Sequence, residues 1–187
     1  MRDVAENTGG TTSVITWFGY DTPADLFDAT DVKYADRGAP SLENFQEGLR
    51  VTHDGPPSHN VVVGHSCGTT VVGTAATEST PLPVDDVILV ASPGANADGV
   101  GDFNLAGVPH DQNGSHVYAT AALGDPVPLY SGTGDFGPNP DGPRYGSTTF
   151  HSDACAPWEA HSSYWDPGSS SLINMGLIIS GNGGRLP

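Results

Sequence analysis

The most informative part of this sequence is Asn60-Val61-Val62-Val63-Gly64-His65-Ser66-Cys67-Gly68-Thr69-Thr70-Val71-Val72-Gly73. Its first half is apolar and β-branched, as is typical of a buried strand, and it breaks at a Gly-x-Ser-x-Gly pattern. Small and apolar residues then continue to Ala76 and predict a helix packed closely on a sheet. Strand, turn and helix in this order predict a nucleophile elbow, with the Ser66 hydroxyl exposed at a strained turn. We expect glycine at 64 and 68 because strand and helix approach each other there.

Other apolar runs define the rest of the fold. Continuous runs predict buried strands at residues 85–91 and 116–121, and a further candidate strand covers 13–18. Apolar spacing predicts an amphipathic helix over 39–49, starting near Pro40 or Ser41, and a final helix over 170–179. Strands that are apolar throughout are typical of parallel sheets covered on both faces. We therefore predict an α/β fold with a mainly parallel sheet and helices on both faces.

The length of 187 residues predicts one domain over 1–187. We expect residues 1–12 to be a flexible lead-in, 181–187 a tail, and 131–147 an irregular loop ordered over the site. No stretch is long enough to cross a bilayer, and the amino terminus lacks the apolar core of a signal peptide. These features predict a soluble chain, either cytoplasmic or exported by a non-classical route.

The charge balance excludes several classes of partner. The chain has 22 acidic and 6 basic residues and a formal net charge of −16. This charge argues against binding to nucleic acid or to an anionic membrane surface. The two cysteines, Cys67 and Cys155, are expected to be thiols, and neither has the spacing of a zinc ligand. No glycine-rich loop with the necessary lysine precedes a helix, so nucleotide chemistry is not expected.

A serine nucleophile needs a base, and the base needs an acid that orients it. Hydrolases with this elbow place them along the chain in the order Ser, Asp or Glu, His. Asp125 follows the strand predicted over 116–121 and is the candidate acid, although Gly-Asp-Pro is also ordinary turn chemistry. His151 and His161 both follow Asp125 and are both candidates for the base. His65 points the wrong way in an elbow and is expected to be a structural neighbour.

An oxyanion hole needs two backbone N–H donors. One should belong to Cys67, the residue after the nucleophile. The other normally comes from a loop that follows an earlier strand, and the only such loop here begins at Gly19-Tyr20. Tyr20 is therefore the second candidate. The N-terminus of the helix that follows Ser66 would add partial positive charge at the same place.

Several motifs, in this order along the chain, resemble the actinobacterial α/β-hydrolases formerly catalogued as DUF1023, a group within the serine hydrolases. They are Trp17-Phe18-Gly19-Tyr20-Asp21-Thr22-Pro23, Gly38-Ala39-Pro40, Gly64-His65-Ser66-Cys67-Gly68-Thr69, Ala91-Ser92-Pro93-Gly94, Asp125-Pro126-Val127 and His161-Ser162-Ser163-Tyr164-Trp165. The resemblance implies an α/β-hydrolase fold with Ser66, Asp125 and His161 as the triad, and no cofactor. It thereby favours His161 over His151 as the base.

Two departures from this group bear on activity. Members usually have Tyr after the nucleophile, where this chain has Cys67. They also have an upstream strand ending in a Pro-Gly loop that supplies the second oxyanion donor, and this sequence begins too late to contain it. The resemblance therefore implies a sheet that lacks an N-terminal strand here. Loss of one oxyanion donor costs on the order of 10²–10³ in turnover.

Three functions follow as hypotheses. The first is a serine hydrolase that cleaves the ester of a small or lipid-like alcohol through an acyl-enzyme. The second is a catalytically silent module whose open sheet edge, near Val14–Trp17, pairs with a partner chain or a second copy. The third is a thiol-dependent enzyme that uses Cys67, which is disfavoured because the residue after an elbow nucleophile faces away from the substrate.

Overall fold

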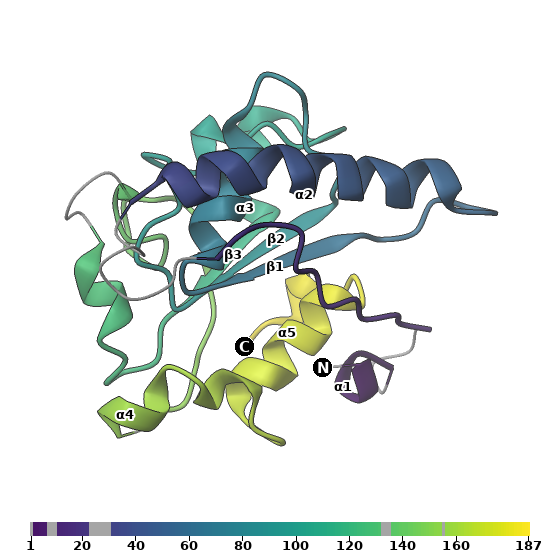
Figure 1. The fold of residues 1–187 in the computed structure, drawn as a ribbon. Coiled ribbons are helices and arrows are strands. Elements are labelled where there is room, and N and C mark those ends of the chain that lie inside the picture. Colours follow the sequence, from purple (N-terminus) through teal and green to yellow (C-terminus); the bar gives the residue numbers. More distant parts are fainter. Residues whose placement is uncertain (1, 7–10, 23–30, 132–135, 155) are drawn as a thin grey trace.

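The computed structural model describes residues 2–6, 11–22, 31–131, 136–154 and 156–187. These residues form a four-stranded sheet in the order β1-β2-β3-β4, with every neighbouring pair parallel and with helices on both faces (Figure 1). The strands are β1 (Val61–His65), β2 (Asp86–Val90), β3 (Val117–Thr120) and β4 (Thr148–Thr149). The α-helices are α1 (Arg2–Glu6), α2 (Lys33–Thr52), α3 (Gly68–Thr77), α4 (Pro157–Ala160) and α5 (Ser170–Ile179). Short 3₁₀ helices span Val100–Asp102, His110–Ser115, Val127–Tyr130, Ser163–Trp165 and Gly183–Arg185.

β2 lies at the centre of the core, and all five of its residues are buried. Its side chains alternate between two apolar clusters, one on each face of the sheet. Val87 and Leu89 join the cluster formed with α2 and α3, whereas Ile88 and Val90 join the cluster formed with α5. Burying one such side chain contributes about 1.5–3 kcal/mol. The prediction of a mainly parallel sheet with helices on both faces is confirmed, and β2 and β3 are buried at every residue.

Helices cover the sheet as two layers. α3 lies on one face with α2 packed across it, and α5 covers the other face together with α1 (Figure 1). The final helix was predicted over 170–179, and α5 has these bounds. The helix predicted over 39–49 is longer, because α2 begins at Lys33 and contains Pro40 in its interior. Pro40 is exposed, so the helix carbonyl that proline leaves without a backbone donor can be hydrated.

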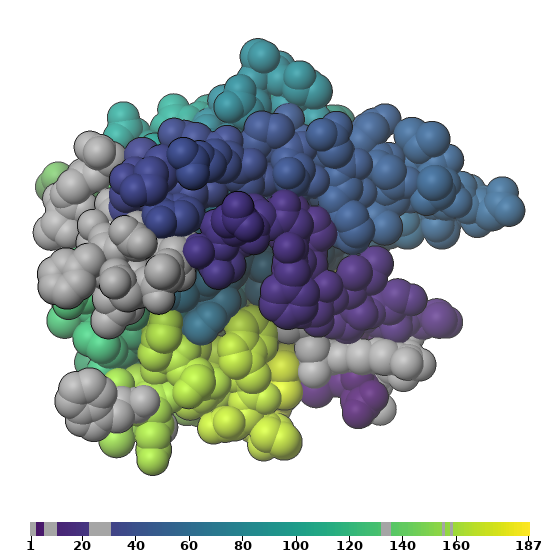
Figure 2. All heavy atoms as spheres, in the orientation of Figure 1, coloured from purple at the N-terminus to yellow at the C-terminus, as the bar shows by residue number. Residues whose placement is uncertain are grey.

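The strand predicted over residues 13–18 is wrong, because residues 11–19 have no regular secondary structure. Val14, Ile15 and Phe18 are 47%, 57% and 82% exposed. Trp17 instead packs on Phe45 of α2, with their ring centroids 6.4 Å apart. β-branched and aromatic residues favour a strand only where a neighbouring strand and burial support it. The segment lies on the surface, in the strip between α2 and the carboxyl-terminal part of the chain (Figure 2).

The edge of the sheet is correspondingly different from the predicted one. Among the described residues β1 has a single neighbour, β2, so β1 forms the edge rather than a strand near Val14–Trp17. The amide of Ser66 donates to Val90 O of β2 at 3.0 Å. In a parallel ladder alternate residues bond to the same neighbour, so the backbone groups of Val61, Val63 and His65 face away from β2.

Described parts of the predicted lead-in and tail pack on neighbouring elements, with α1 lying on α5. In α1, Ala5 is fully buried, and Val4 lies so close to Gly176 of α5 that a side chain at Gly176 would collide with it. At the other terminus, Gly183 lies against the Tyr118 ring of β3. Residues 7–10 lie outside the described ranges. A polar composition near a chain terminus is therefore compatible with packing on the fold.

The loop predicted over 131–147 is described at residue 131 and from residue 136 onward, and it leads into β4, which the sequence did not predict. Phe136 and Tyr145 of this loop are buried. No helix within the described parts of the chain is both long and apolar enough to cross a bilayer.

Candidate active site

The carboxyl ends of the parallel strands bring the predicted site residues to one edge of the sheet. Ser66 follows β1, Ser92 follows β2 and Asp125 follows β3. In open parallel sheets this is the edge where ligands bind.

Ser66 lies in a tight turn, residues 65–67, which we call the Ser66 turn. Its φ is +56°, a left-handed conformation that non-glycine residues rarely adopt and that is often found at functional sites. Thr69 N donates to Ser66 O at 2.9 Å as α3 begins. A Cβ at Gly64 would lie 2.8 Å from Thr69 Cα, so the expected close approach is confirmed there. The same prediction is wrong at Gly68, because nothing lies within 4 Å of a Cβ built there.

A chain of buried hydroxyl groups holds the Ser66 turn from below. Thr69 Oγ1 donates to Ser66 O at 2.6 Å and is 2.7 Å from Ser92 Oγ. Because the Thr69 proton is used on Ser66, the Ser92 hydroxyl is the donor in that second bond. Gly94 N then donates to Ser92 Oγ at 3.0 Å. These bonds tie the strained turn after β1 to the loop after β2.

Asp125 and His161 form a hydrogen-bonded pair. His161 Nδ1 lies 3.0 Å from Oδ2 and 3.1 Å from Oδ1 of Asp125, whose side chain is fully buried. Burial favours the neutral carboxyl. Hydrogen bonds from His161, from Val127 N and from Tyr164 outweigh burial, and they hold the pKa of Asp125 below its ordinary value. The ionised carboxylate accepts from Nδ1–H, and this tautomer leaves Nε2 of His161 able to accept a proton.

Tyr164 is a site residue that the sequence analysis did not single out. Its hydroxyl donates to Asp125 Oδ2 at 2.8 Å and accepts from Ala122 N at 2.7 Å. The side chain is 1% exposed, and burial raises the pKa of its phenol. The only available signal was its place three residues after His161. Tyr164 fixes the carboxylate to the end of β3.

His65 connects the Ser66 turn to the segment that carries His161. His65 Nε2 lies 2.8 Å from His161 O, and the two ring centroids are 4.7 Å apart. Burial, and secondarily the neighbouring His161, lower the pKa of His65, so its neutral form donates Nε2–H to that carbonyl. Among the described residues, Ser66 Oγ and His161 Nε2 are not joined by a hydrogen bond. Such bonds are often long in unliganded sites.

The remaining candidates for base and nucleophile are His151 and the two cysteines. The side chain of His151 is 69% exposed and lies 3.8 Å from Asp153, whereas the buried Asp125 pairs with His161. Cys155 lies outside the described residues. Cys67 carries a thiol, and burial raises its pKa even though hydrogen bonding with Ser66 lowers it. A raised pKa disfavours the thiolate that a cysteine nucleophile requires.

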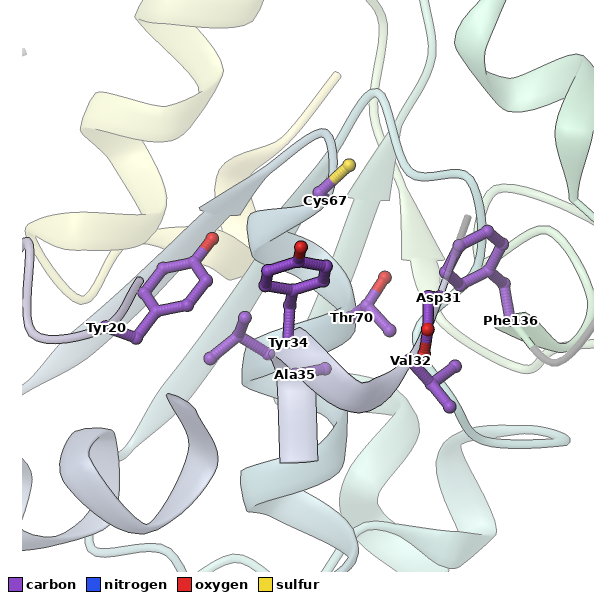
Figure 3. Close-up of a pocket in the computed structure, with 9 residues that line it drawn as sticks. Tyr20, Asp31, Val32, Tyr34, Ala35, Cys67, Thr70 and Phe136 are labelled. Carbon is purple, nitrogen blue, oxygen red and sulfur yellow. The ribbon is translucent and has the colours of Figure 1, made fainter. Parts of the chain in front are cut away.

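A small pocket adjoins Cys67, and the predicted oxyanion residues Cys67 and Tyr20 both line it. The rest of its lining comes mainly from the start of α2 and from α3, with Phe136. The hydroxyl groups of Tyr20 and Tyr34 point to the end where Cys67 lies (Figure 3). The backbone roles of Cys67 and Tyr20 stay predictions. Within the described ranges no three His, Cys, Asp or Glu side chains form a group that could hold a metal ion.

A parallel sheet with helices on both faces, a serine at a strained strand-to-helix turn and an Asp–His pair beyond β3 define the chain as a protein of the α/β-hydrolase class. A family model described as alpha/beta hydrolase matches residues 1–129. The chain belongs to this family.

The relatives found among known proteins are mycobacterial. The uncharacterized protein Rv2079 of Mycobacterium tuberculosis is 32% identical over 211 residues, which cover 97% of this chain and 31% of that protein. The uncharacterized protein Mb0988c of Mycobacterium bovis is 38% identical over 80 residues, covering 43% of this chain and 29% of that protein. The chain thus spans about a third of the length of the curated relatives it matches. No solved structure matches it significantly.

Proposed function

We propose that this chain is a serine hydrolase that cleaves carboxylic esters with Ser66 as nucleophile, His161 as base and Asp125 as the acid that orients it. One observation carries the proposal. The hydrogen bond of 3.0 Å between His161 Nδ1 and Asp125 lies at the edge of the sheet where Ser66 occupies a left-handed turn. Pairs of this kind, brought together from distant parts of a chain, are what activates a serine hydroxyl.

The reaction proceeds in two halves. Ser66 Oγ attacks the ester carbonyl carbon while its proton passes to His161 Nε2, and the carbonyl oxygen becomes an oxyanion. Cys67 N–H, at the start of α3, stabilises this oxyanion together with the partial positive charge of the helix terminus. The intermediate expels the alcohol oxygen, which takes the proton from His161 and leaves an acyl group on Ser66. Water then attacks the acyl-enzyme by the same steps and releases the acid.

The substrate class is an ester of a small or lipid-like alcohol. The pocket beside Cys67 combines the apolar side chains of Val32, Ala35 and Val71 with tyrosine hydroxyls. The cavity has a volume of only about 10 Å³, room for about one water molecule, so its lining residues would have to move apart to admit an acyl or alcohol group.

The first test is labelling with a fluorophosphonate probe, read by intact mass. We expect one adduct on the wild-type chain and none on Ser66→Ala. Asp125→Asn should slow labelling by a factor on the order of 10⁴, because the wrong His161 tautomer is then held. His151→Asn is the matched control and should label at the wild-type rate. Labelling that persists in Ser66→Ala, or His151→Asn behaving like Asp125→Asn, would refute the assignment.

A second candidate is a catalytically silent module that binds a partner along its sheet edge. It is favoured by the single neighbour of β1 within the described chain and by the backbone groups of Val61 and Val63 that face away from β2. A folded protein that takes up no probe but changes its oligomeric state when the charge-introducing change Val63→Lys is made would support this candidate over the hydrolase.

A further inference from the structure

His65 is the one histidine at the site for which the proposed reaction has no use. It is the last residue of β1 and directly precedes Ser66. Its ring lies 4.7 Å from that of His161 and meets Trp165 edge-on at 5.7 Å, centroid to centroid. It meets the Tyr164 ring edge-on as well, at 6.0 Å. The half-buried, neutral imidazole of His65 donates its Nε2–H to one acceptor, the His161 carbonyl, at 2.8 Å.

We infer that His65 is a positioning residue for the base: its Nε2–H holds the backbone of His161 at the distance from the Ser66 turn that proton transfer requires. The inference rests on the proposed function. His161 is anchored through its ring to Asp125, which follows β3, and through its carbonyl to His65, which ends β1. A ring anchored only at Nδ1 can still pivot about that bond, whereas a second anchor on the backbone fixes where Nε2 points.

The packing around His161 explains why a dedicated anchor is needed. The residue follows α4, a helix of four residues, and precedes a 3₁₀ helix of three residues. Both are short helices outside the sheet, so no backbone ladder holds His161 in place. The nucleophile, in contrast, is held by β1, by α3 and by the Thr69–Ser92 hydroxyl chain. Without a side-chain link the base would be the least constrained member of the site, and a displacement of about 1 Å can cost on the order of 10² in rate.

Three variants separate a hydrogen bond from simple packing. His65→Phe keeps a ring but has no donor, and His65→Asn is shorter and cannot reach the His161 carbonyl. His65→Gln places an amide N–H near the position of Nε2. We expect His65→Phe and His65→Asn to lower kcat on a p-nitrophenyl ester by about 10- to 100-fold with little change in KM. His65→Gln should stay within about threefold of wild type, because the donor is restored.

The matched control is His53→Phe, which removes another imidazole that bonds a carbonyl, that of Pro56 at 2.8 Å, in an exposed loop. It should leave kcat unchanged. Wild-type turnover in both His65→Phe and His65→Asn would overturn the inference, and so would equal loss in His65→Gln and His65→Asn. If His65→Phe does not fold, the comparison of Asn with Gln decides alone.

A readout independent of turnover keeps failure of this inference distinct from failure of the proposed function. The His161 imidazole is followed by NMR through a pH titration in wild type, His65→Asn and His65→Gln. We expect His161 resonances to shift and broaden in the Asn variant and to return towards wild type in the Gln variant. Identical His161 spectra in all three would overturn the inference. Absence of Ser66-dependent probe labelling in the wild-type chain would instead refute the hydrolase proposal.

Discussion

Removing one hydroxyl group, in Tyr164→Phe, tests the hydrogen-bond network beneath the candidate base. Two buried bonds are lost with it. One is the bond of 2.8 Å to Asp125 Oδ2, and the other is the bond of 2.7 Å that the hydroxyl accepts from Ala122 N. The ring itself stays, so the change makes no cavity larger than one oxygen atom. The variant therefore isolates the polar contribution of Tyr164.

The expected loss of stability follows from the state in which Tyr164→Phe leaves the two former partners, the Asp125 carboxylate and the Ala122 N–H. A hydrogen bond to a charged group contributes about 1.5–3 kcal/mol, and a buried N–H left without a partner costs about 1–3 kcal/mol. Allowing for partial relaxation, we expect the free energy of unfolding to fall by about 2–5 kcal/mol near neutral pH. In a chain of this size each kcal/mol lowers Tm by about 2–4 °C.

The stability difference between wild type and Tyr164→Phe should also depend on pH in a defined direction. The pKa of Asp125 lies below its ordinary value in the folded chain because hydrogen bonds, that of Tyr164 among them, favour the carboxylate. Such a group stabilises the fold fully above the ordinary pKa of an aspartate, and the contribution is lost as pH falls through the lowered folded value. The difference between wild type and Tyr164→Phe should therefore be largest near neutrality and shrink in acid.

Urea unfolding near neutral pH and at about pH 3 measures both quantities. Tyr145→Phe is the matched control, because Tyr145 is 3% exposed and its hydroxyl is buried without a hydrogen-bond partner among the described atoms. We expect Tyr145→Phe to be neutral or stabilising. Equal losses in the two variants, or a Tyr164→Phe loss that does not change with pH, would refute the reasoning.

Two further predictions concern the two ends of β1. Gly64→Ala should destabilise the chain by about 1–3 kcal/mol in urea unfolding, because its Cβ would lie 2.8 Å from Thr69 Cα, whereas Gly68→Ala meets nothing within 4 Å and should cost less than 1 kcal/mol. At the opposite end of the sheet, His59 Nε2 lies 3.0 Å from Asp86 Oδ2, and this hydrogen bond raises the pKa of His59. The stability that this bond contributes is fully present below the ordinary histidine pKa and is lost as pH rises through the raised folded value. His59→Gln should therefore destabilise the chain more near pH 5.5 than near pH 8.5. These values lie about one unit below and about two units above the ordinary histidine pKa. Equal effects of the two glycine variants, or a His59→Gln effect that grows with pH, would contradict these expectations.

The elements that were predicted well are those whose sequence pattern reports burial directly. β2 is apolar at four successive positions because both of its faces are covered. This pattern can be recognised in the sequence without knowing which elements pack on the strand. Residues 13–18 have similar propensities, yet they lie on the surface. Strand formation depends on a partner from elsewhere in the chain, which propensity does not encode. β4 was missed because two residues carry no periodic pattern.

The candidate site also contains residues that the sequence predicted and residues that it did not. The order of Ser66, Asp125 and His161 along the chain, with each turn placed after a strand, was enough to predict that they meet at one edge. The structure brings Asp125 and His161 to 3.0 Å. Tyr164 and His65 take their importance from contacts across 39 and 96 residues of sequence, and neither has a local motif that indicates its partner. Their contacts are therefore set by the tertiary structure and not by local sequence.

The way in which His161 is held has a consequence for local unfolding. Its segment, residues 157–165, is attached to the sheet through the side chains of Tyr164, Asp125 and His65 rather than through a backbone ladder. Segments held in this way open with a smaller free energy than the strands they cover. Detachment of the His161 segment and unfolding of the sheet are therefore separate events, and we expect mild denaturant or modest heating to cause the first before the second. The chain would lose the hydrogen bond between His161 and Asp125 while the amides of β2 are still protected from hydrogen exchange.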